Sequence, residues 1–245
     1  MRPRFALAAF LDKWESRLRR VGEHLGWPQA WLHEFIDYRG DPRMTLEEFN
    51  VRFTLKRMEA EPRITGQLTE AQARDFYTTS DYLMWRNLVH RRHTAWRRVL
   101  WTMRGRHGTL LEYGCGIAPI SAWVSRARPT WLYHPVDLPS PHLDYARWRL
   151  RGVVVRAEES LMCRYDVATL IDVLEHLPDP ETVTRDVVRR IVPGGYLHVN
   201  FVGNPKRNDL DLATPEQREA TVDYLYRNMG FVAHSFGHLV LRKLR

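Results

Sequence analysis

The sequence of 245 residues lacks several features that mark special classes of protein. It has only two cysteines, Cys115 and Cys163, so neither a disulfide framework nor a cysteine metal site is expected. No apolar run approaches the roughly 20 residues that a membrane-spanning helix needs. The short apolar stretch near the start is interrupted by Asp12 and Lys13 and does not have the features of a signal peptide. These absences predict a soluble, cytoplasmic protein.

Lysine is also scarce, so the net charge of +8 comes almost wholly from arginine. The lysines are Lys13, Lys56, Lys206 and Lys243. A GC-rich genome produces such an arginine-rich composition, and many of the basic residues recur among acids at helical spacing. We therefore interpret most of them as solvated helix faces, with binding of an anionic substrate or of RNA as the alternative. Hydrophobic residues at 44% and charged residues at 27% are ordinary for a globular protein.

Helix patterns dominate the first part of the chain, up to about residue 104. Apolar residues between Phe5 and Leu25 recur at helical spacing and form a stripe that needs a partner surface. Two pairs, Thr45 with Glu48 and Thr69 with Gln72, are spaced as capping boxes at helix starts. Further helices are predicted over residues 28–40, 45–60 and 69–77, and one long helix over residues 81–103.

After Gly108, apolar strands alternate with helices, which predicts right-handed βαβ units and a mainly parallel sheet. Strands are predicted at 109–113, 131–136, 153–156, 167–171 and 196–201, and helices at 117–126, 143–150, 181–191 and 215–228, the last after a capping box of Thr214 and Gln217. Two runs on either side of Gly237 predict a closing hairpin. The expected fold class is α/β: a Rossmann-like, mainly parallel sheet with a terminal antiparallel hairpin in residues 105–245, and an all-helical lid region in residues 1–104.

The first predicted strand ends in a glycine-rich turn, LLEYGCGIAPI at 110–120. Gly114 and Gly116 permit a tight turn and close approach of the backbone to a ligand at the carboxyl end of the strand. A dinucleotide fingerprint needs a third glycine where Pro119 stands. Glu112 would oppose a pyrophosphate but suits the ammonium and sulfonium of S-adenosylmethionine (SAM). The charges therefore favour SAM over NAD. Asp137, after the second strand, suits the ribose of either cofactor.

The order of several motifs resembles that of class I SAM-dependent methyltransferases. E-x-G-x-G-x-A at 112–118 and V-D at 136–137 match the first two motifs, with alanine where a third glycine is usual. YDVATLIDVLEHLPDP at 165–180 is similar to the branch that includes the ubiquinone and menaquinone methyltransferases. VPGGYLHVNF at 192–201 and MGF at 229–231 follow in the family's order, so the resemblance covers about 100–245. It implies an enzyme with SAM as cofactor and S-adenosylhomocysteine (SAH) as product.

The resemblance also implies roles for individual residues around SAM. Glu112, Gly114 and Gly116 would line the methionine end, and Asp137 would hold the ribose. Leu138 would pack on the adenine. The acid that usually approaches the adenine amino group aligns with Ala157, so Glu158 or Glu159 would take its place, and we choose Glu158. The remaining two positions, which would close the pocket beside the methyl group, are Ile171 and Asp172.

Candidates for the chemistry on the acceptor side follow the fourth predicted strand. His176 is a plausible general base because histidine titrates near neutral pH, and Glu175 stands beside it. Together with Asp172 they also resemble a segment that holds a divalent metal ion in some relatives, with His198 as a fourth ligand if its strand presents it there. We do not favour this metal site. Structural roles for His176 remain an alternative.

The helical region is the expected acceptor lid, and the segment 203–211 is a second candidate. Tyr77, Tyr82 and Arg86 are the predicted acceptor contacts, with His90 and His93 on the same helix face as Tyr82 and Arg86. The alternative for these residues is a solvated or buried structural face.

The leading functional prediction is methyl transfer to oxygen, nitrogen or carbon of a small-molecule metabolite, in a biosynthetic pathway. An RNA or DNA methyltransferase is the first alternative. The sequence has neither a D/N-P-P-Y/F segment nor a Pro-Cys nucleophile, since Met162 precedes Cys163, so nucleic acid is not the expected partner. A non-catalytic SAM-binding partner protein is the second alternative, and a NAD-dependent enzyme the third. A homodimer stays open.

Overall fold

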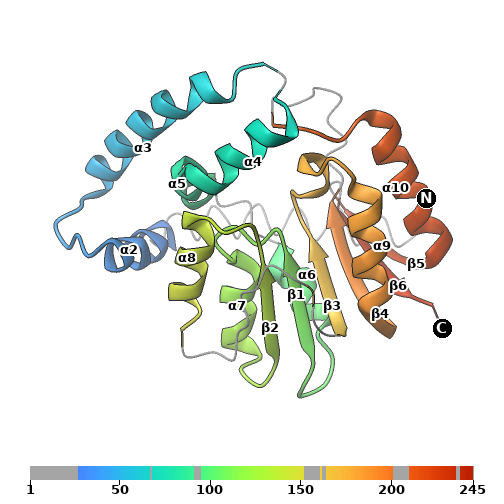
Figure 1. The fold of residues 1–245 in the computed structure, drawn as a ribbon. Coiled ribbons are helices and arrows are strands. Elements are labelled where there is room, and N and C mark those ends of the chain that lie inside the picture. Colours follow the sequence, from blue (N-terminus) through green and yellow to red (C-terminus); the bar gives the residue numbers. More distant parts are fainter. Residues whose placement is uncertain are drawn as a thin grey trace.

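The computed structural model shows an α/β protein in which helices cover both faces of one sheet and an arch of helices lies over one end of it (Figure 1). The structure describes residues 27–66, 68–90, 95–151, 161, 164–200, 210–235 and 238–244. The predicted helix at 5–25 and the predicted strand at 153–156 lie outside these residues. No helix of the described residues has the length and apolar character to cross a bilayer.

The six strands of the described sheet lie in the order β2-β1-β3-β4-β6-β5. Their bounds are β1 Thr109–Tyr113, β2 Leu132–Val136, β3 Tyr165–Leu170, β4 Ile191–Asn200, β5 Met229–Ser235 and β6 His238–Lys243. The first four strands pair in parallel, whereas β6 runs antiparallel to both β4 and β5. This confirms the predicted parallel sheet with a terminal antiparallel hairpin.

The predicted turn at residues 193–195 lies inside β4 and does not precede it. Pairing with β3 jumps from Tyr165 opposite Ile191 to Val167 opposite Tyr196, so β4 carries extra residues at this point. Gly194 has a φ of +80°, which an L side chain rarely adopts. The turn is therefore a bulge in a strand that begins earlier than predicted.

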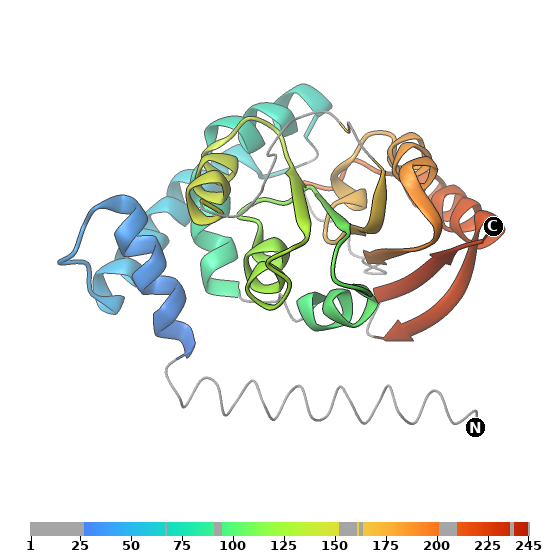
Figure 2. The same ribbon diagram turned by 90° about the horizontal axis from the view of Figure 1, so that it is seen from below.

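Alternating residues of the strands face two hydrophobic clusters. Leu110 joins a cluster with α6 (Ala95–Thr102) and α7 (Pro119–Ala127) on one face. Leu111 joins a cluster with α9 (Pro180–Arg190) and α10 (Pro215–Asn228) on the other face. Figure 2 shows the two groups of helices on opposite sides of the sheet. α8 (Pro141–Arg149) packs against α7 through small and apolar side chains. The core is thus a three-layer α/β sandwich.

The arch over the sheet consists of α2 (Trp27–Arg39), α3 (Leu46–Ala60), a short 3-10 turn η1 (Glu61–Arg63), α4 (Glu70–Thr79) and α5 (Tyr82–His90). One hydrophobic cluster joins α2, α3 and α5 to Ile117 and Tyr145 of the sheet region. A second joins α4 and α5 to Leu210. The arch is therefore anchored over the ends of β1 and β3, where the glycine turn lies (Figure 1).

The long helix predicted at 81–103 corresponds to two elements, α5 and α6, and residues 91–94 between them lie outside the described part. They serve different parts of the fold. α5 packs in the arch, while α6 covers the sheet beside α7. The helix nearest to β1 in sequence thus belongs to the layer on the sheet.

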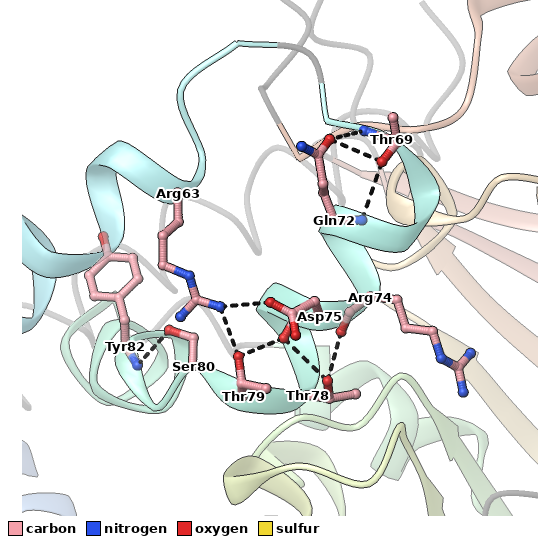
Figure 3. Close-up of polar contacts among 9 residues, drawn as sticks. All are labelled: Arg63, Thr69, Gln72, Arg74, Asp75, Thr78, Thr79, Ser80 and Tyr82. Carbon is pink, nitrogen blue, oxygen red and sulfur yellow. Dashed lines mark hydrogen bonds and ion pairs between the residues drawn. The ribbon is translucent and has the colours of Figure 1, made fainter.

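Two of the three predicted capping boxes are formed, at Thr69 with Gln72 (Figure 3) and at Thr214 with Gln217. In the third predicted capping box, Thr45 with Glu48, only the first of the two hydrogen bonds is formed. The Thr45 side chain accepts from the Glu48 N–H, but the Glu48 carboxylate pairs with Arg52 on the next turn. An arginine at the i+4 position thus replaces the backbone N–H as the partner of Glu48.

Candidate active site

The glycine turn after β1 has a left-handed backbone at three positions. Gly114 has a φ of +62° and Gly116 a φ of +51°, and Ala118 also lies in this region at +47°. A Cβ on Gly114 would collide with the side chain of Val173, which follows β3. At Gly116, a Cβ would stand 3.3 Å from Nδ2 of Asn87 on α5. The turn therefore needs both glycines, and it lies against both β3 and the arch.

Glu112 lies under this turn and is 3% exposed. Its two carboxylate oxygens accept hydrogen bonds from the backbone N–H groups of Ile120 and Ser121, at 3.0 and 2.7 Å, in the first turn of α7. Burial raises the pKa of Glu112 to about 7, against the opposing effect of these bonds. A phosphate at a helix N-terminus would use the same kind of N–H groups. Because the protein's own carboxylate occupies these two, a pyrophosphate has no place there.

Asp137 connects the end of β2 to the glycine turn. Its Oδ2 accepts from the Gly116 N–H at 2.6 Å, and its Oδ1 accepts from the Leu138 N–H at 2.7 Å. Each carboxylate oxygen has a further lone pair, so both can still accept a bond from a ligand hydroxyl. Leu138 itself is half-buried. The predicted ribose and adenine contacts thus lie next to the predicted methionine contacts.

Asp172 follows β3 with a φ of +54°, a strained conformation for a residue other than glycine. It is held by a double contact with Asn200, the last residue of β4. The Asp172 N–H donates to the Asn200 side-chain oxygen, and the Asn200 side-chain amide donates to the Asp172 carboxylate. The exposed carboxylate of Asp172 is therefore fixed at the carboxyl edge of the sheet. Its neighbour Ile171 packs instead with the cluster beneath α6 and α7.

Glu175 is buried in a short 3-10 turn, η2 (Leu174–His176). Its Oε2 has no hydrogen-bond partner in the described structure. Burial, together with the nearby charges of Asp172 and Asp211, raises the pKa of Glu175 to about 7. A buried carboxyl oxygen without a partner is costly, and such groups mark sites of function or of a missing ligand.

His176 is held by the residues just before α10. Its Nδ1 lies 3.1 Å from the Leu210 carbonyl and 3.4 Å from Oδ1 of Asp211, which in turn pairs with Arg218 at 2.9 Å. Since a carbonyl only accepts, Nδ1 carries the proton and Nε2 carries a lone pair. Nε2 is 3.9 Å from Oε1 of Glu175, beyond hydrogen-bond distance. Burial lowers the pKa of His176, so the neutral ring predominates at pH 7.

The three predicted acceptor contacts fall into two places. The ring of Tyr77 lies 5.8 Å from the ring of His176. Burial raises the pKa of Tyr77, and the charges of Glu175, Asp137 and Asp211 add to this effect. Tyr82 and Arg86 lie on α5 and line a cavity beside α3. Glu158, His93 and the segment 203–209 lie outside the described residues, as does the side chain of His90.

The strand does not present His198 to the pocket, so the condition for it to be a fourth metal ligand is not met. Its Nε2 lies 2.7 Å from the Thr102 hydroxyl on α6, in a buried position, and burial lowers its pKa to about 3. Leu197 and Val199 face the opposite cluster, so strand alternation turns His198 away from the other candidate ligands. No group of three or more His, Cys, Asp and Glu side chains within the described ranges is arranged to hold a metal ion.

The residues at this edge fit SAM by charge and by shape. The carboxylates of Asp137 and Asp172 stand beside the left-handed glycine turn, where a cationic ligand is favoured. The amide positions that a phosphate would use are occupied by Glu112. The turn has no side chain at Gly114 or Gly116, so a ligand can approach its backbone.

Comparison with known proteins agrees with this geometry. A family model described as "Methyltransferase domain" matches residues 84–230. The ubiquinone biosynthesis O-methyltransferase of Proteus mirabilis is 36% identical over 110 residues, covering 40% of this chain and 43% of the relative. That of Pseudomonas paraeruginosa is 29% identical over 109 residues, covering 40% and 46%. The matches thus span less than half the length of these curated relatives.

Solved structures share the fold at low sequence identity. The plantazolicin methyltransferase BpumL, in complex with SAH, aligns with a TM-score of 0.51 at 12% identity, over 79% of this chain and 100% of that chain. CalS10, an amino pentose methyltransferase from Micromonospora echinaspora, aligns with a TM-score of 0.50 at 16% identity, over 65% and 96%. These likenesses show the common α/β fold.

The chain therefore belongs to the methyltransferase-domain family. This family agrees with the resemblance to class I SAM-dependent methyltransferases that the motifs at 112–118 and 165–180 carry.

Proposed function

We propose that the protein transfers the methyl group of SAM to a hydroxyl oxygen of a small-molecule acceptor in a biosynthetic pathway, with His176 as the general base. The observation that carries this proposal is the fixed, neutral ring of His176. Its Nδ1 is held by the Leu210 carbonyl, with Asp211 behind it, and its Nε2 is left as a proton acceptor. The names of the curated relatives, which are O-methyltransferases, support a hydroxyl acceptor.

The need for a base separates hydroxyl acceptors from amines. A neutral amine attacks through its own lone pair, whereas a hydroxyl is a weak nucleophile until its proton is removed. SAM, when bound, supplies a methyl group on a positively charged sulfur. As the acceptor oxygen bonds to the methyl carbon, the methyl–sulfur bond breaks and the hydroxyl proton passes to Nε2 of His176.

Glu175 is the second polar group that we assign to the acceptor. Its Oε2 is buried and lacks a partner in the described structure, and a pKa of about 7 leaves it partly protonated at neutral pH. It can therefore donate a hydrogen bond to the acceptor or accept one. This role explains why an unpartnered carboxyl is kept beside His176.

For the cofactor, we assign the turn of Gly114 and Gly116 to the methionine end, and Asp137 to the ribose. Leu138 is assigned to the adenine and Asp172 to the region of the methyl group. Glu112 acts through the turn, because its oxygens hold the start of α7. Ile171 supports this edge from the core side. The role of Glu158 at the adenine, the use of a small molecule over nucleic acid, and a homodimer stay predictions.

The test is a His176→Asn variant, assayed for methyl transfer from labelled SAM to catechol and to a panel of phenols. We expect kcat to fall about 100-fold or more, in line with the loss of a general base. The wild-type kcat should rise with pH through a pKa below 6.5 and then level off, and the variant should lose this rise. SAH binding, measured by calorimetry, should stay within threefold.

His142→Asn is the matched control, because His142 is a buried histidine of α8 whose pKa is also lowered, to about 4. Its activity should stay close to that of the wild type. Retention of kcat and of the pH-dependent rise in His176→Asn would rule out the base. Absence of transfer to every hydroxyl compound, with SAH still bound, would rule out the hydroxyl acceptor.

A further inference from the structure

A cavity of about 300 Å³ lies between α3, the η1 turn and α5. Its lining combines aromatic, basic and apolar side chains: Phe53, Arg57, Glu61, Ile64, Tyr82 and Arg86. Leu210, just before α10, completes it. Binding sites for small molecules begin at about this size, and a single substituted ring fits such a volume.

The cavity lies next to the proposed base. Leu210 belongs to both, since its side chain lines the cavity and its carbonyl accepts from Nδ1 of His176. Arg86 also lines the cavity, and its positive charge lowers the pKa of both His176 and Tyr77. The cavity is thus joined through Leu210 to the Nδ1 side of the His176 ring, and Nε2 lies on the side of Glu175.

The charges of the side chains that line the cavity favour a ligand with one negatively charged group. Arg57 is already paired with Glu61, with Nε 2.7 Å from the carboxylate oxygen. Arg86 is half-buried and has no hydrogen-bond or ion-pair partner among the described residues. The lining therefore has one net positive charge, and it belongs to Arg86. A carboxylate is the natural partner, because a guanidinium binds it with two parallel hydrogen bonds.

One wall of the cavity holds two aromatic rings that stack on each other. The rings of Phe53 and Tyr82 lie nearly parallel, at 12° and with centroids 5.9 Å apart. Ile64 and Leu210 add apolar surface. Such a wall suits a planar ring, which gains from stacking and from burial of apolar area.

The rim of the cavity is held in place without a ligand. Arg63 of η1 donates to Asp75 at 3.1 Å and to Thr79 at 2.8 Å on α4, as Figure 3 shows. Its guanidinium also lies over the ring of Phe76. The Tyr82 N–H donates to the Ser80 hydroxyl where α5 begins (Figure 3). These contacts fix the turn that carries Glu61 and Ile64, so the cavity is preorganised.

We propose that this cavity is the acceptor pocket and that the acceptor is a small hydroxylated aromatic carboxylic acid. Its ring lies against Phe53 and Tyr82, its carboxylate pairs with Arg86, and a ring hydroxyl points toward His176. The role of the hydroxyl rests on the proposed function, whereas the binding of the carboxylate does not.

The test compares 3,4-dihydroxybenzoate with catechol, which has the same ring and hydroxyls but no carboxylate. Calorimetry on the protein saturated with SAH should show 3,4-dihydroxybenzoate binding at least about tenfold more tightly, as expected for a charged hydrogen bond. In Arg86→Gln, the two compounds should bind equally. In Arg227→Gln, which removes an exposed and paired arginine of α10 outside the cavity, the preference should stay within threefold of that of the wild type.

The proposal is overturned if the wild type shows no preference, if Arg86→Gln keeps it, or if neither compound binds. His176→Asn separates this test from that of the proposed function. The preference should survive in that variant while methyl transfer is lost. If transfer persists there but the preference still depends on Arg86, the base is wrong and the pocket stands. SAH binding to Arg86→Gln, unchanged within threefold, shows that this variant is folded.

Discussion

The glycine turn and the acceptor cavity lie at the same end of the sheet, but different kinds of contact hold them. In the turn, carboxylates bind backbone N–H groups: Glu112 those of Ile120 and Ser121, and Asp137 that of Gly116. In the cavity, side chains of α3, η1 and α5 meet Leu210, which lies just before α10. The turn is thus held by bonds to the backbone, whereas the cavity depends on side chains that are far apart in sequence.

This difference suggests a division of labour within the chain. In the function proposed above, the turn, which is defined by backbone geometry, binds the methyl donor that SAM-dependent methyltransferases share. A cavity lined by side chains can change its ligand through single substitutions, because no backbone hydrogen bond depends on them. Arg149 connects the turn to the arch: it pairs with Glu34 of α2 at 2.9 Å and donates to the Ile117 carbonyl in the turn at 3.0 Å.

The largest expected effect comes from comparing two glycines with a left-handed backbone, of which only one has space for a Cβ. Gly114→Ala would place a methyl group against Val173 at a left-handed position, so we expect SAH affinity to fall at least about 100-fold. Gly105→Ala is the matched control, since Gly105 has a φ of +79° but its nearest neighbour, the His107 carbonyl, is 3.8 Å away. Calorimetry should show SAH binding lost only in the first. Equal binding by both variants would contradict the proposed role of the turn.

The next effect concerns the ion pair of Arg149 and Glu34, which connects the glycine turn to the arch. Glu34→Ala removes the carboxylate partner of Arg149, whose side chain is 1% exposed, so we expect a loss of about 3 kcal/mol in the free energy of unfolding. Asp144→Ala, which breaks the exposed pair with Arg147, should cost about 0.5 kcal/mol or less. Urea denaturation measures both. Similar losses in the two variants would show that the buried pair does not connect the arch to the turn.

A third prediction concerns pH. The pKa of Glu112 is raised to about 7 from 4.5, so the folded state binds its proton more tightly than the unfolded state. The contribution of Glu112 to stability is therefore full below pH 4.5 and is lost as the pH rises toward 7. Relative to Glu112→Gln, the wild type should lose about 3 kcal/mol between pH 4.5 and 7.5. Urea denaturation at both pH values gives this difference, and a constant difference would contradict the raised pKa.

The smallest effect compares two equal capping boxes in different regions. Thr69→Ala at α4 and Thr214→Ala at α10 should each lower the free energy of unfolding by about 1 kcal/mol. Since α4 holds Arg63 and the rim of the cavity, only Thr69→Ala should also weaken binding of 3,4-dihydroxybenzoate, by about threefold. Calorimetry on both variants decides this, and equal weakening would show that α4 does not position the cavity.

The contrast between local patterns and contacts of distant residues explains which features could be predicted from the sequence. β1 was predicted to the residue, and the end of α10 at Asn228 was predicted too, because strand runs and caps are local patterns. The class of enzyme followed from the short motifs at 112–118 and 165–180, and the family match confirms it. Glu175 and His176 were proposed for the same reason, and their roles stay predictions.

Features that depend on distant partners were missed. Phe53 and Arg57 have no local signal for a pocket, since they meet Arg86 and Leu210 only through the packing of α3 on α5. Asn200 had a weak signal, as a polar residue that ends an apolar strand. To predict where the His198 side chain points, one must know which face of the sheet carries the site. The alternation of residues along the strand does not give this information.

The position of β6 between β4 and β5 has a consequence for how the protein is made. In the described sheet, β5 pairs only with β6, although it leaves the ribosome first. Until residues 238–243 emerge, β5 has no strand to join and β4 has an open edge, a surface that invites pairing with other chains. Because β5 reaches the described sheet only through β6, the hairpin joins the sheet as a unit.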